Sequence, residues 1–562
     1  MTNKYILDDI SMNQQNGAQL LVKCLETQGV EYIFGIPGAK IDAVFNALLD
    51  SSIKLIVCRH EQNAAFMAAA WGRLTGKPGV VLVTSGPGVA NLTTGLITAT
   101  TEGDPIVALG GQVPRAMIGK QSHQSANNIR LMQAATKNSI EARLAETIPE
   151  LIENAFRIAA TPPYGACFIS LPQDVLSEST NRLPINLMPP SIYGSANLEL
   201  LQKVANIINK AKQPVILLGL EASRTEHTKA IRALLHHAPF SVVSTFQAAG
   251  VLDKTLFKHF LGRVGLFKNQ PGDQLLDLAD VVITIGYNPV EYDPETWNIG
   301  NKKTIIHIHN HPCDVHYTYH PVCELLGDIS ATINTLSPLL KPRQHTTDHQ
   351  KIHRLHQALV DEVDAHKNRN QTPIHPLRFI HELQQAIDDE TTICCDVGSV
   401  YMWMARYFFC YKPHQLLFSN GQQTLGVALP WAMACQYARP GRSTVSISGD
   451  GGFLFSAMEL ETAVREGLQF IHFIWRDGTY NMVLEQEMMK YHRQSGVQLG
   501  RVNIPDFARA FGAVGFELHD PNEFQTIFNQ AKKEKKPVLI DVAIDYADNH
   551  RLFEIIDPNA GH

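Results

Sequence analysis

The run Thr444-Val445-Ser446-Ile447-Ser448-Gly449-Asp450-Gly451-Gly452 decides the fold predicted for the last third of the chain. Its first five residues predict a short strand that passes directly into a glycine-rich turn, and we expect a helix over residues 456–465. Glycines at such a junction let backbone amides approach a phosphate, and Asp450 offers a carboxylate to a cation such as Mg²⁺. The alternative is an ordinary tight turn.

A second apolar run favours the phosphate interpretation. Residues 470–475 predict another strand, which ends in Arg476-Asp477-Gly478-Thr479-Tyr480, and Asp477 follows Asp450 by 27 residues. That spacing is one strand–helix–strand unit. Because parallel strands end at the same edge of a sheet, both carboxylates are expected in the crevice where such sheets bind ligands.

The same alternation of strands and helices continues through the whole chain. Short β-rich runs recur, and an alanine-rich helix is expected from Glu61 to Leu74, ending near Gly76. The pattern predicts an α/β protein of three doubly wound parallel-sheet domains. Composition breaks at 183–191 and 341–373 place these domains at residues 12–185, 191–342 and 370–550.

Bulk composition excludes several classes of function. The 562 residues are 44% hydrophobic and 18% charged, with a net charge of −6, which argues against binding to nucleic acid or to an anionic membrane. No apolar run approaches the roughly 18–20 residues of a membrane span. Nine scattered cysteines form no CxxC pair, and residues 1–15 lack the features of a signal peptide. We therefore expect a cytoplasmic protein.

The two acidic turns resemble the signature of thiamine-diphosphate-dependent enzymes. The resemblance implies that the Asp450 and Asp477 side chains and the Thr479 backbone carbonyl bind Mg²⁺. It also implies that Gly451, Gly452 and Tyr480 contact the cofactor, with the C-terminal domain holding the diphosphate. The family usually carries an asparagine and a glycine where Gly478 and Thr479 stand here, an exchange that a carbonyl ligand tolerates.

Thiamine chemistry also needs an acid at the pyrimidine ring, and Glu61 is the candidate. A glutamate that opens a helix is explained equally well by the helix dipole. However, the segment from Val57 to Ala68 resembles the glutamate-bearing helix of the thiamine-diphosphate decarboxylase superfamily. It also lies in the N-terminal third, which the resemblance assigns to the pyrimidine-binding domain.

Two further segments resemble parts of that site. The run from Ser419 to Pro430 is similar to the loop that holds the cofactor bent, with Leu425 as the apolar wedge and Gln423 as a further contact. Gly398 and Ser399 follow a strand expected over residues 391–395, and are placed to touch the diphosphate.

Within the superfamily, the chain most resembles the catabolic, FAD-independent acetolactate synthases. The matching segments are Phe34–Asp42, the Glu61 helix, Thr84–Gly88, Glu102–Pro105, Gly262–Phe267, Tyr287–Tyr292 and Asn420–Pro430. The resemblance implies that pyruvate is decarboxylated on thiamine diphosphate and that the two-carbon unit is ligated to a second pyruvate, giving 2-acetolactate and CO₂. Side chains expected to orient the substrate are those of Lys40, Gln124, Gln422 and Gln486.

The resemblance also bears on FAD and on assembly. FAD is not expected, because residues 263–267 and 287–292 follow the FAD-free pattern. His309-Asn310-His311 stands where close relatives tend to carry an acidic residue, which argues further against a contact with the ribose of a nucleotide. A homodimer, or a dimer of dimers, is implied, with Glu61 of one subunit facing the diphosphate domain of another.

Three alternatives stay open from the residues alone. One is another thiamine-diphosphate-dependent 2-oxo-acid decarboxylase or oxidase, and another is a catalytically inactive cofactor-binding scaffold. The third is a histidine-rich metal-binding protein, suggested by 24 histidines and the cluster at residues 345–366. The choice between pyruvate and 2-oxobutyrate, and between dimer and tetramer, is also open.

Overall fold

The computed structural model describes residues 15–189, 191–342 and 349–553. The chain forms two compact units, Met1–Pro190 and Ser191–His562, whose boundary falls in the predicted linker at 183–191. The polar N-terminus and part of the 345–366 histidine cluster lie outside the described residues. None of the described helices is long and apolar enough to cross a membrane.

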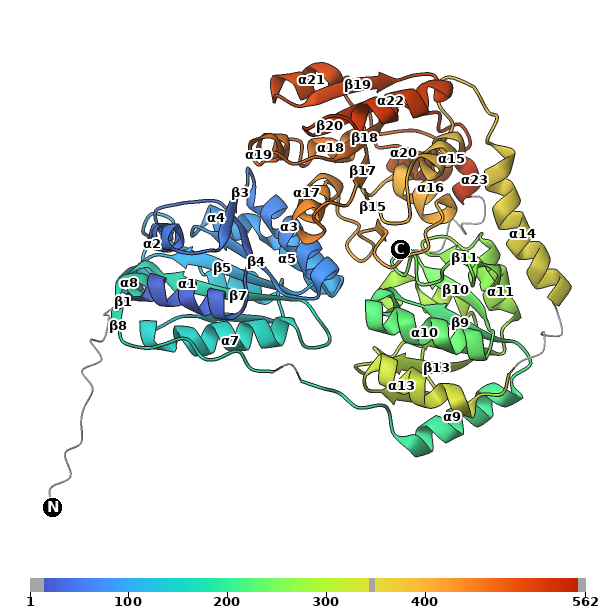
Figure 1. Ribbon diagram of the computed structural model, residues 1–562, viewed down its shortest axis with the longest axis horizontal. Helices are drawn as coiled ribbons and strands as arrows, with labels where there is room; N and C mark the ends of the chain where they lie inside the picture. The colour runs from blue at the N-terminus through green and yellow to red at the C-terminus, as the bar shows by residue number, and fades with distance from the viewer. Residues whose placement is uncertain (1–14, 190, 343–348, 554–562) are drawn as a thin grey trace. The chain divides into compact units, whose positions relative to one another are not determined.

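The first unit is built on one parallel six-stranded sheet with the order β3-β2-β4-β5-β7-β6 (Figure 1). Helices α1 and α7 share a core on one face of the sheet. Helices α3 and α5 contact each other, with α3 packed against β4 and α5 packed against β7. The bounds are β2 Tyr32–Gly35, β3 Lys54–Val57, β4 Gly79–Val83, β5 Ile106–Gln112, β6 Asn138–Glu141, β7 Ala166–Pro172, α1 Gly17–Thr27, α3 Glu61–Thr75, α5 Thr93–Thr101 and α7 Ile148–Ala159.

The second unit contains two such sheets, of which the first has the order β11-β10-β9-β12-β13-β14. Helices α9, α10 and α13 share a core on one face, and α11 packs with β10 and β11 on the other. The bounds are β9 Pro214–Leu218, β10 Ser241–Thr245, β11 Phe260–Val264, β12 Val281–Ile285, β13 Thr304–His309, β14 Cys323–Leu326, α9 Leu198–Lys210, α10 Thr225–His237, α11 Pro271–Leu278 and α13 Ile329–Leu336.

The last sheet has the order β16-β15-β17-β18-β20-β19, which is the topology of the first. Helices α15, α16 and α22 share its largest core, and α17 and α21 pack against its strands. The bounds are β15 Thr392–Cys395, β16 Leu416–Leu417, β17 Thr444–Gly449, β18 Ile471–Arg476, β19 Val514–Leu518, β20 Val538–Ala543, α15 Pro376–Ala386, α16 Ser399–Tyr407, α17 Ala428–Ala438, α21 Ile504–Ala510 and α22 Phe524–Ala531.

Three parallel sheets flanked by helices confirm the predicted fold class. In each sheet the strand order reverses at the first central strand, which places the ligand crevices beside β2, β9 and β15. One helix differs from its prediction over 456–465. A short helix α18, Asp450–Leu454, begins directly after β17, and α19 begins only at Glu459 and ends at Arg465. Extended backbone at Gly449 lets the chain turn into α18 without a loop.

Candidate active site

A cavity of about 470 Å³ lies at the carboxyl edge of the last sheet, where β15, β17 and β18 end. It collects nearly every residue predicted for this domain. The lining includes Gly398, Ser399, Gln423, Leu425, Asp450, Gly451, Gly452, Asp477, Thr479, Tyr480 and Gln486. Gln422 lies on the same loop but is not part of this lining.

The two aspartates form a desolvated acidic pair. Asp450 accepts hydrogen bonds from the backbone N–H groups of Gly451 (3.0 Å) and Gly478 (2.9 Å), and Asp477 accepts one from the Thr479 hydroxyl. Burial, and then the charge of Asp477, raises the pKa of Asp450 to about 6, and burial also raises the pKa of Asp477. Two carboxylates that oppose each other's ionisation form a donor set suited to a divalent cation.

The third predicted metal ligand is the Thr479 carbonyl. The backbone around it is held by hydrogen bonds from Tyr480 N–H to the Val497 carbonyl (2.9 Å) and from Leu499 N–H to the Gly478 carbonyl (2.8 Å). Among the described residues, no hydrogen bond reaches the Thr479 carbonyl itself. Two carboxylates and one unbonded carbonyl are oxygen ligands of the kind that Mg²⁺ takes, so this set of residues fits the ion.

The glycines of the site leave room for close approach of a ligand to backbone. Helix α16 starts at Ser399, directly after Gly398, which has a φ of 126°. An added Cβ at Gly398 would have no atom within 4 Å. At Gly451 a Cβ would meet the Tyr480 ring at 2.6 Å. The first amides of α16 have no partner within their helix, so they are available to phosphate oxygens.

Asp396 is a functional residue whose role sequence reasoning missed. Its buried carboxylate accepts hydrogen bonds from the N–H groups of Val397 (2.8 Å), Gly426 (2.9 Å) and Ala428 (3.4 Å), and burial raises its pKa to about 6. These bonds tie the loop that carries Leu425 to the end of β15. The only signal in the sequence was an acidic residue directly after a strand.

Other lining residues also lacked a sequence signal. Leu266 comes from the central domain. Asn481 precedes β20 in the sequence, and Tyr546 follows it. The Asn481 side chain acts to lower the pKa of the Asp477 carboxyl, and the buried Asn549 donates to Ser399 and Asn481. Leu266 belongs to the Gly262–Phe267 segment, which carried the resemblance but no role at the site, and the asparagines and Tyr546 lie outside the quoted segments, so only the folded chain assigns them to the site.

In the first unit, the three predicted residues follow strands of the N-terminal sheet. Glu61 is the first residue of α3 after β3, and its Oε2 accepts a hydrogen bond of 2.9 Å from the Asn91 amide. Lys40 follows β2. Gln124, with φ 60°, has its backbone close to Gly86, where an added Cβ would meet the Gln124 carbonyl at 3.3 Å. These segments share the carboxyl edge of their sheet.

In the histidine segment of the central domain, His309 is buried, whereas Asn310 and His311 are half-buried. His309 at the end of β13 stacks on His307 with ring centroids 5.2 Å apart. Burial lowers the pKa of His307 to about 4 and holds the pKa of His309 well below its usual value. Both imidazoles are therefore neutral at physiological pH. The segment therefore carries a neutral imidazole near the position where close relatives are expected to carry an acidic side chain.

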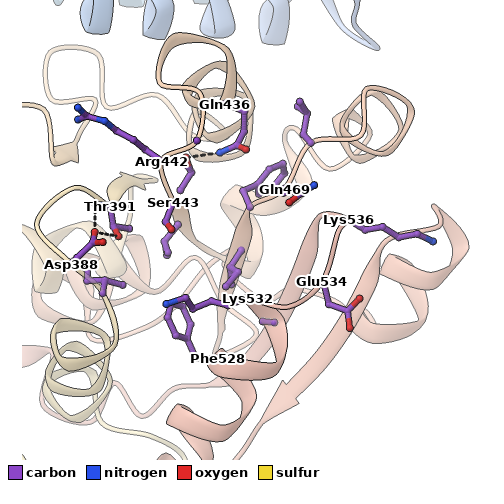
Figure 2. Close-up of a pocket in the computed structure, with 18 of the residues that line it drawn as sticks. Asp388, Thr391, Gln436, Arg442, Ser443, Gln469, Phe528, Lys532, Glu534 and Lys536 are labelled. Atoms are coloured by element: carbon purple, nitrogen blue, oxygen red, sulfur yellow. Dashed lines mark hydrogen bonds between the residues drawn. The ribbon is translucent and has the colours of Figure 1, made fainter.

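A second cavity, of about 490 Å³, lies at the opposite, amino edge of the last sheet (Figure 2). It contains none of the predicted site residues. Several of its polar groups bond to one another: Asp388 accepts from Thr391, and Gln436 donates to Thr444. Ligands of parallel α/β sheets bind at the carboxyl edge, so the Asp450 cavity is the better candidate.

Within the part of the chain that the structure describes, the histidine-rich alternative has one structural counterpart, the group of His366, His375 and Asp548. His375 Nδ1 accepts a hydrogen bond from the Leu377 N–H (3.2 Å) at the start of α15, so the neutral ring carries its proton on Nε2 and donates to Asp548 (3.1 Å). Arg369 binds the same Asp548 oxygen at 2.9 Å. These bonds favour a structural helix cap over a metal site.

Comparison with known proteins finds matches along most of the chain. The three domains described for thiamine pyrophosphate enzymes match the chain: the N-terminal TPP binding domain at residues 15–132, the central domain at 201–336 and the C-terminal TPP binding domain at 396–542. The chain is 49% identical to "Acetolactate synthase" of Bacillus subtilis, over 96% of this chain and 95% of that protein. It is 45% identical to "Acetolactate synthase, catabolic" of Raoultella terrigena, over 96% of each.

A more distant relative is "Acetolactate synthase isozyme 2 large subunit" of Escherichia coli, at 28% identity over 97% of this chain and 98% of that protein. Full-length similarity at this level, together with three matching domains in the expected order, identifies the family. The chain therefore belongs to the thiamine pyrophosphate enzymes and, within them, to the acetolactate synthase family.

Proposed function

We propose that this protein is an acetolactate synthase that converts two molecules of pyruvate into 2-acetolactate and CO₂. The observation that carries the proposal is the single cavity that joins Asp450, Asp477 and the Thr479 carbonyl to the start of α16. It occurs in a chain nearly half identical to a protein of that name.

The residues divide the work between the two units. Asp450, Asp477 and the Thr479 carbonyl would hold Mg²⁺, and the backbone at Gly398, Ser399, Gly451 and Gly452 would hold the diphosphate. When bound, thiamine diphosphate supplies the nucleophile that attacks the 2-oxo acid and the ring that accepts electrons as CO₂ leaves. Glu61 would exchange a proton with the pyrimidine ring. Lys40 would pair with a substrate carboxylate, and Gln124, Gln422 and Gln486 would orient the acceptor pyruvate.

The proposal includes a homodimer or a dimer of dimers in which Glu61 serves the site of another subunit. Support comes from apolar side chains around the end of α18: Leu454, Phe455 and Met458 are 44%, 46% and 38% exposed. A second copy that covered them would remove these apolar side chains from water. Full activity of a monomer, established by light scattering at assay dilution, would contradict this part.

Absence of FAD and a cytoplasmic location are also proposed. The FAD-free pattern of residues 263–267 and 287–292 supports the former. The nine cysteines are all free thiols, eight of them buried, which supports a reducing compartment. Analysis of the purified protein should find thiamine diphosphate and Mg²⁺ and no flavin absorbance.

The deciding experiment is incubation of purified protein with pyruvate, Mg²⁺ and thiamine diphosphate. Acetolactate, measured as acetoin after acidification, is the expected main product. Acetaldehyde or acetyl phosphate instead would favour the decarboxylase or oxidase alternative. Glu61→Gln should remove turnover, whereas Glu199→Gln, an exposed glutamate in the first turn of α9, should not. Full turnover by Glu61→Gln would overturn the proton-exchange role.

A further inference from the structure

A chain of hydrogen bonds runs from the buried core of the C-terminal domain to Asn481, which lines the candidate metal site together with Asp477. The indole N–H of Trp403, on α16, donates to Asn549 Oδ1 at 2.6 Å. The Asn549 amide donates to the Ser399 hydroxyl at 3.0 Å and to Asn481 Oδ1. Asn481 in turn lines the cavity together with Asp477, and its side chain acts to lower the pKa of the Asp477 carboxyl. Trp403 is 1% and Asn549 0% exposed, so water does not replace these partners.

The direction of every bond in this chain follows from its buried end. An indole N–H is a donor only, so Asn549 must turn its oxygen toward Trp403 and its amide toward Ser399 and Asn481. Asn481 therefore presents its oxygen to Asn549. Its own amide is then left to face Asp477, where it lies as a donor toward a carboxylate. One fixed donor sets the orientation of two asparagine side chains.

The same logic limits what Ser399 does. Its hydroxyl accepts from Asn549 and donates its single proton to Asn481 Oδ1 at 2.9 Å. That proton is therefore not available to a phosphate oxygen. The backbone N–H of Ser399, at the start of α16, remains as its donor toward a ligand. Ser399 thus contacts the diphosphate through backbone and supports Asn481 through its side chain.

We propose that Asn549 is a positioning residue of the metal–diphosphate site, which it reaches through Ser399 and Asn481. The inference rests on the proposed function, because it assigns Asp477 to the metal. Residues that orient metal ligands through hydrogen bonds commonly change metal affinity by about 10-fold to 100-fold when they are replaced. Asn549 lies 150 residues from Ser399, in the segment that follows the last strand.

Asn549→Asp is the informative variant. An aspartate still accepts from Trp403, but it has no amide to donate to Ser399 or Asn481, so the Ser399 hydroxyl must turn its proton toward the new carboxylate. Asn481 should then turn its own amide to the new carboxylate and its oxygen to Asp477. We expect the Kd for Mg²⁺, measured by titration calorimetry at saturating thiamine diphosphate, to rise about 10-fold to 100-fold. Asn549→Leu should give a similar loss.

The matched control is Asn298→Asp in the central domain. Asn298 is also 0% exposed, and it donates to the Thr318 carbonyl (2.6 Å) and accepts from Lys303 N–H (3.1 Å); none of these three residues lines the cavity. It should lower the melting temperature of the metal-free protein as much as Asn549→Asp does, yet leave the Kd for Mg²⁺ unchanged. A purely structural role of Asn549 predicts that both variants behave alike.

The outcomes separate this inference from the proposed function. If the wild type binds no Mg²⁺ with thiamine diphosphate, the proposed function fails. If the wild type binds and Asn549→Asp binds with the same Kd, only the positioning role fails. Should the Asn549 variants not fold, the indole N–H resonance of Trp403 in ¹⁵N-tryptophan-labelled wild type decides. The coupling requires that resonance to shift on saturation with Mg²⁺ and thiamine diphosphate, and an unshifted resonance overturns it.

Discussion

The side-chain amide of Asn91 donates a hydrogen bond of 2.9 Å to Oε2 of Glu61. An amide N–H on one carboxyl oxygen leaves the other to carry the proton when Glu61 is protonated. That other oxygen, Oε1, lies on the side of Gly88, where an added Cβ would come within 3.6 Å of it. Asn91 therefore selects which oxygen of the proposed proton-exchanging acid faces its partner.

Replacing Asn91 with leucine removes this selection. A hydrogen bond to a charged group contributes about 1.5–3 kcal/mol, so turnover of pyruvate should fall about 10-fold to 100-fold with an unchanged melting temperature. The direct measurement is the exchange rate of the thiazolium C2 proton, followed by NMR after a jump into D₂O. Asn46→Leu, an exposed asparagine on α2 (Asp42–Ala47), is the matched control. Equal exchange rates in both variants would remove the role of Asn91.

Local signals in the sequence predicted the two acidic turns and the Glu61 helix well. Helix α3 begins at Glu61 and is followed by Gly76 with φ 73°, because alanines favour the helix and glycine permits the left-handed end. Asp450 and Asp477 were expected at one edge because parallel strands align their ends. All of these are properties of short segments, which is why they could be read without the folded chain.

The supporting hydrogen bonds could not be predicted in the same way. Asn91 follows Glu61 by 30 residues, and Asn549 follows Ser399 by 150. Each is an isolated asparagine whose partner is chosen by packing, so no periodicity or motif marks it. The boundary of α18 was also missed, because a five-residue helix with glycines at its second and third positions contradicts helix propensity.

The Asp396 clamp predicts a specific weakness of the cofactor loop. The backbone N–H groups of Val397, Gly426 and Ala428 all donate to the Asp396 carboxylate. In Asp396→Asn, an NH₂ group replaces one carboxylate oxygen, so at least one of these backbone N–H groups faces another donor. Loss of a buried hydrogen bond costs about 1–3 kcal/mol, and we expect thiamine diphosphate to bind about 10-fold more weakly. Calorimetry on the metal-saturated protein measures it.

Asp280→Asn provides the comparison for that experiment. Asp280 also accepts two backbone N–H groups, from Lys212 (2.7 Å) and Gln213 (2.8 Å), but it lies in the central domain. It should lower stability without changing the affinity for thiamine diphosphate. If both variants weaken the cofactor equally, the effect is global and the clamp is not specific to the loop.

Gly426, beside Leu425, offers a test of packing at the same loop. Its φ is +86°, and a Cβ there would lie 2.6 Å from Cβ of Phe455. Gly441 has φ +78° with nothing within 4 Å of a Cβ. Alanine at either position costs about 1–2 kcal/mol of backbone strain, but only Gly426→Ala adds an overpacking cost of about 1–3 kcal/mol. Chemical denaturation should show the difference, and equal losses would mean that Phe455 moves aside freely.

Magnesium and pH should act together through Asp450. Its pKa of about 6, raised by burial and by Asp477, lies above the unfolded value of 3.8. For a raised pKa, the stabilising contribution is complete at low pH and is lost as the pH rises through about 6. The metal-free protein should therefore lose on the order of 2 kcal/mol between about pH 4 and pH 8 from this group. Mg²⁺ neutralises the ionised pair, so it restores that stability only where the pair is ionised.

The measurement is the melting temperature with Mg²⁺ minus that with a chelator, taken at about pH 5 and about pH 8. We expect a clearly larger difference at the higher pH, because protons compete with the metal below the pKa of Asp450. Asp450→Asn should abolish the response to Mg²⁺. It should also make the metal-free protein more stable at the higher pH, because it removes one of two negative charges that repel each other. Asp42→Asn, at an exposed position in α2, should change neither. A magnesium response that is equal at both pH values would contradict a shared metal at Asp450 and Asp477.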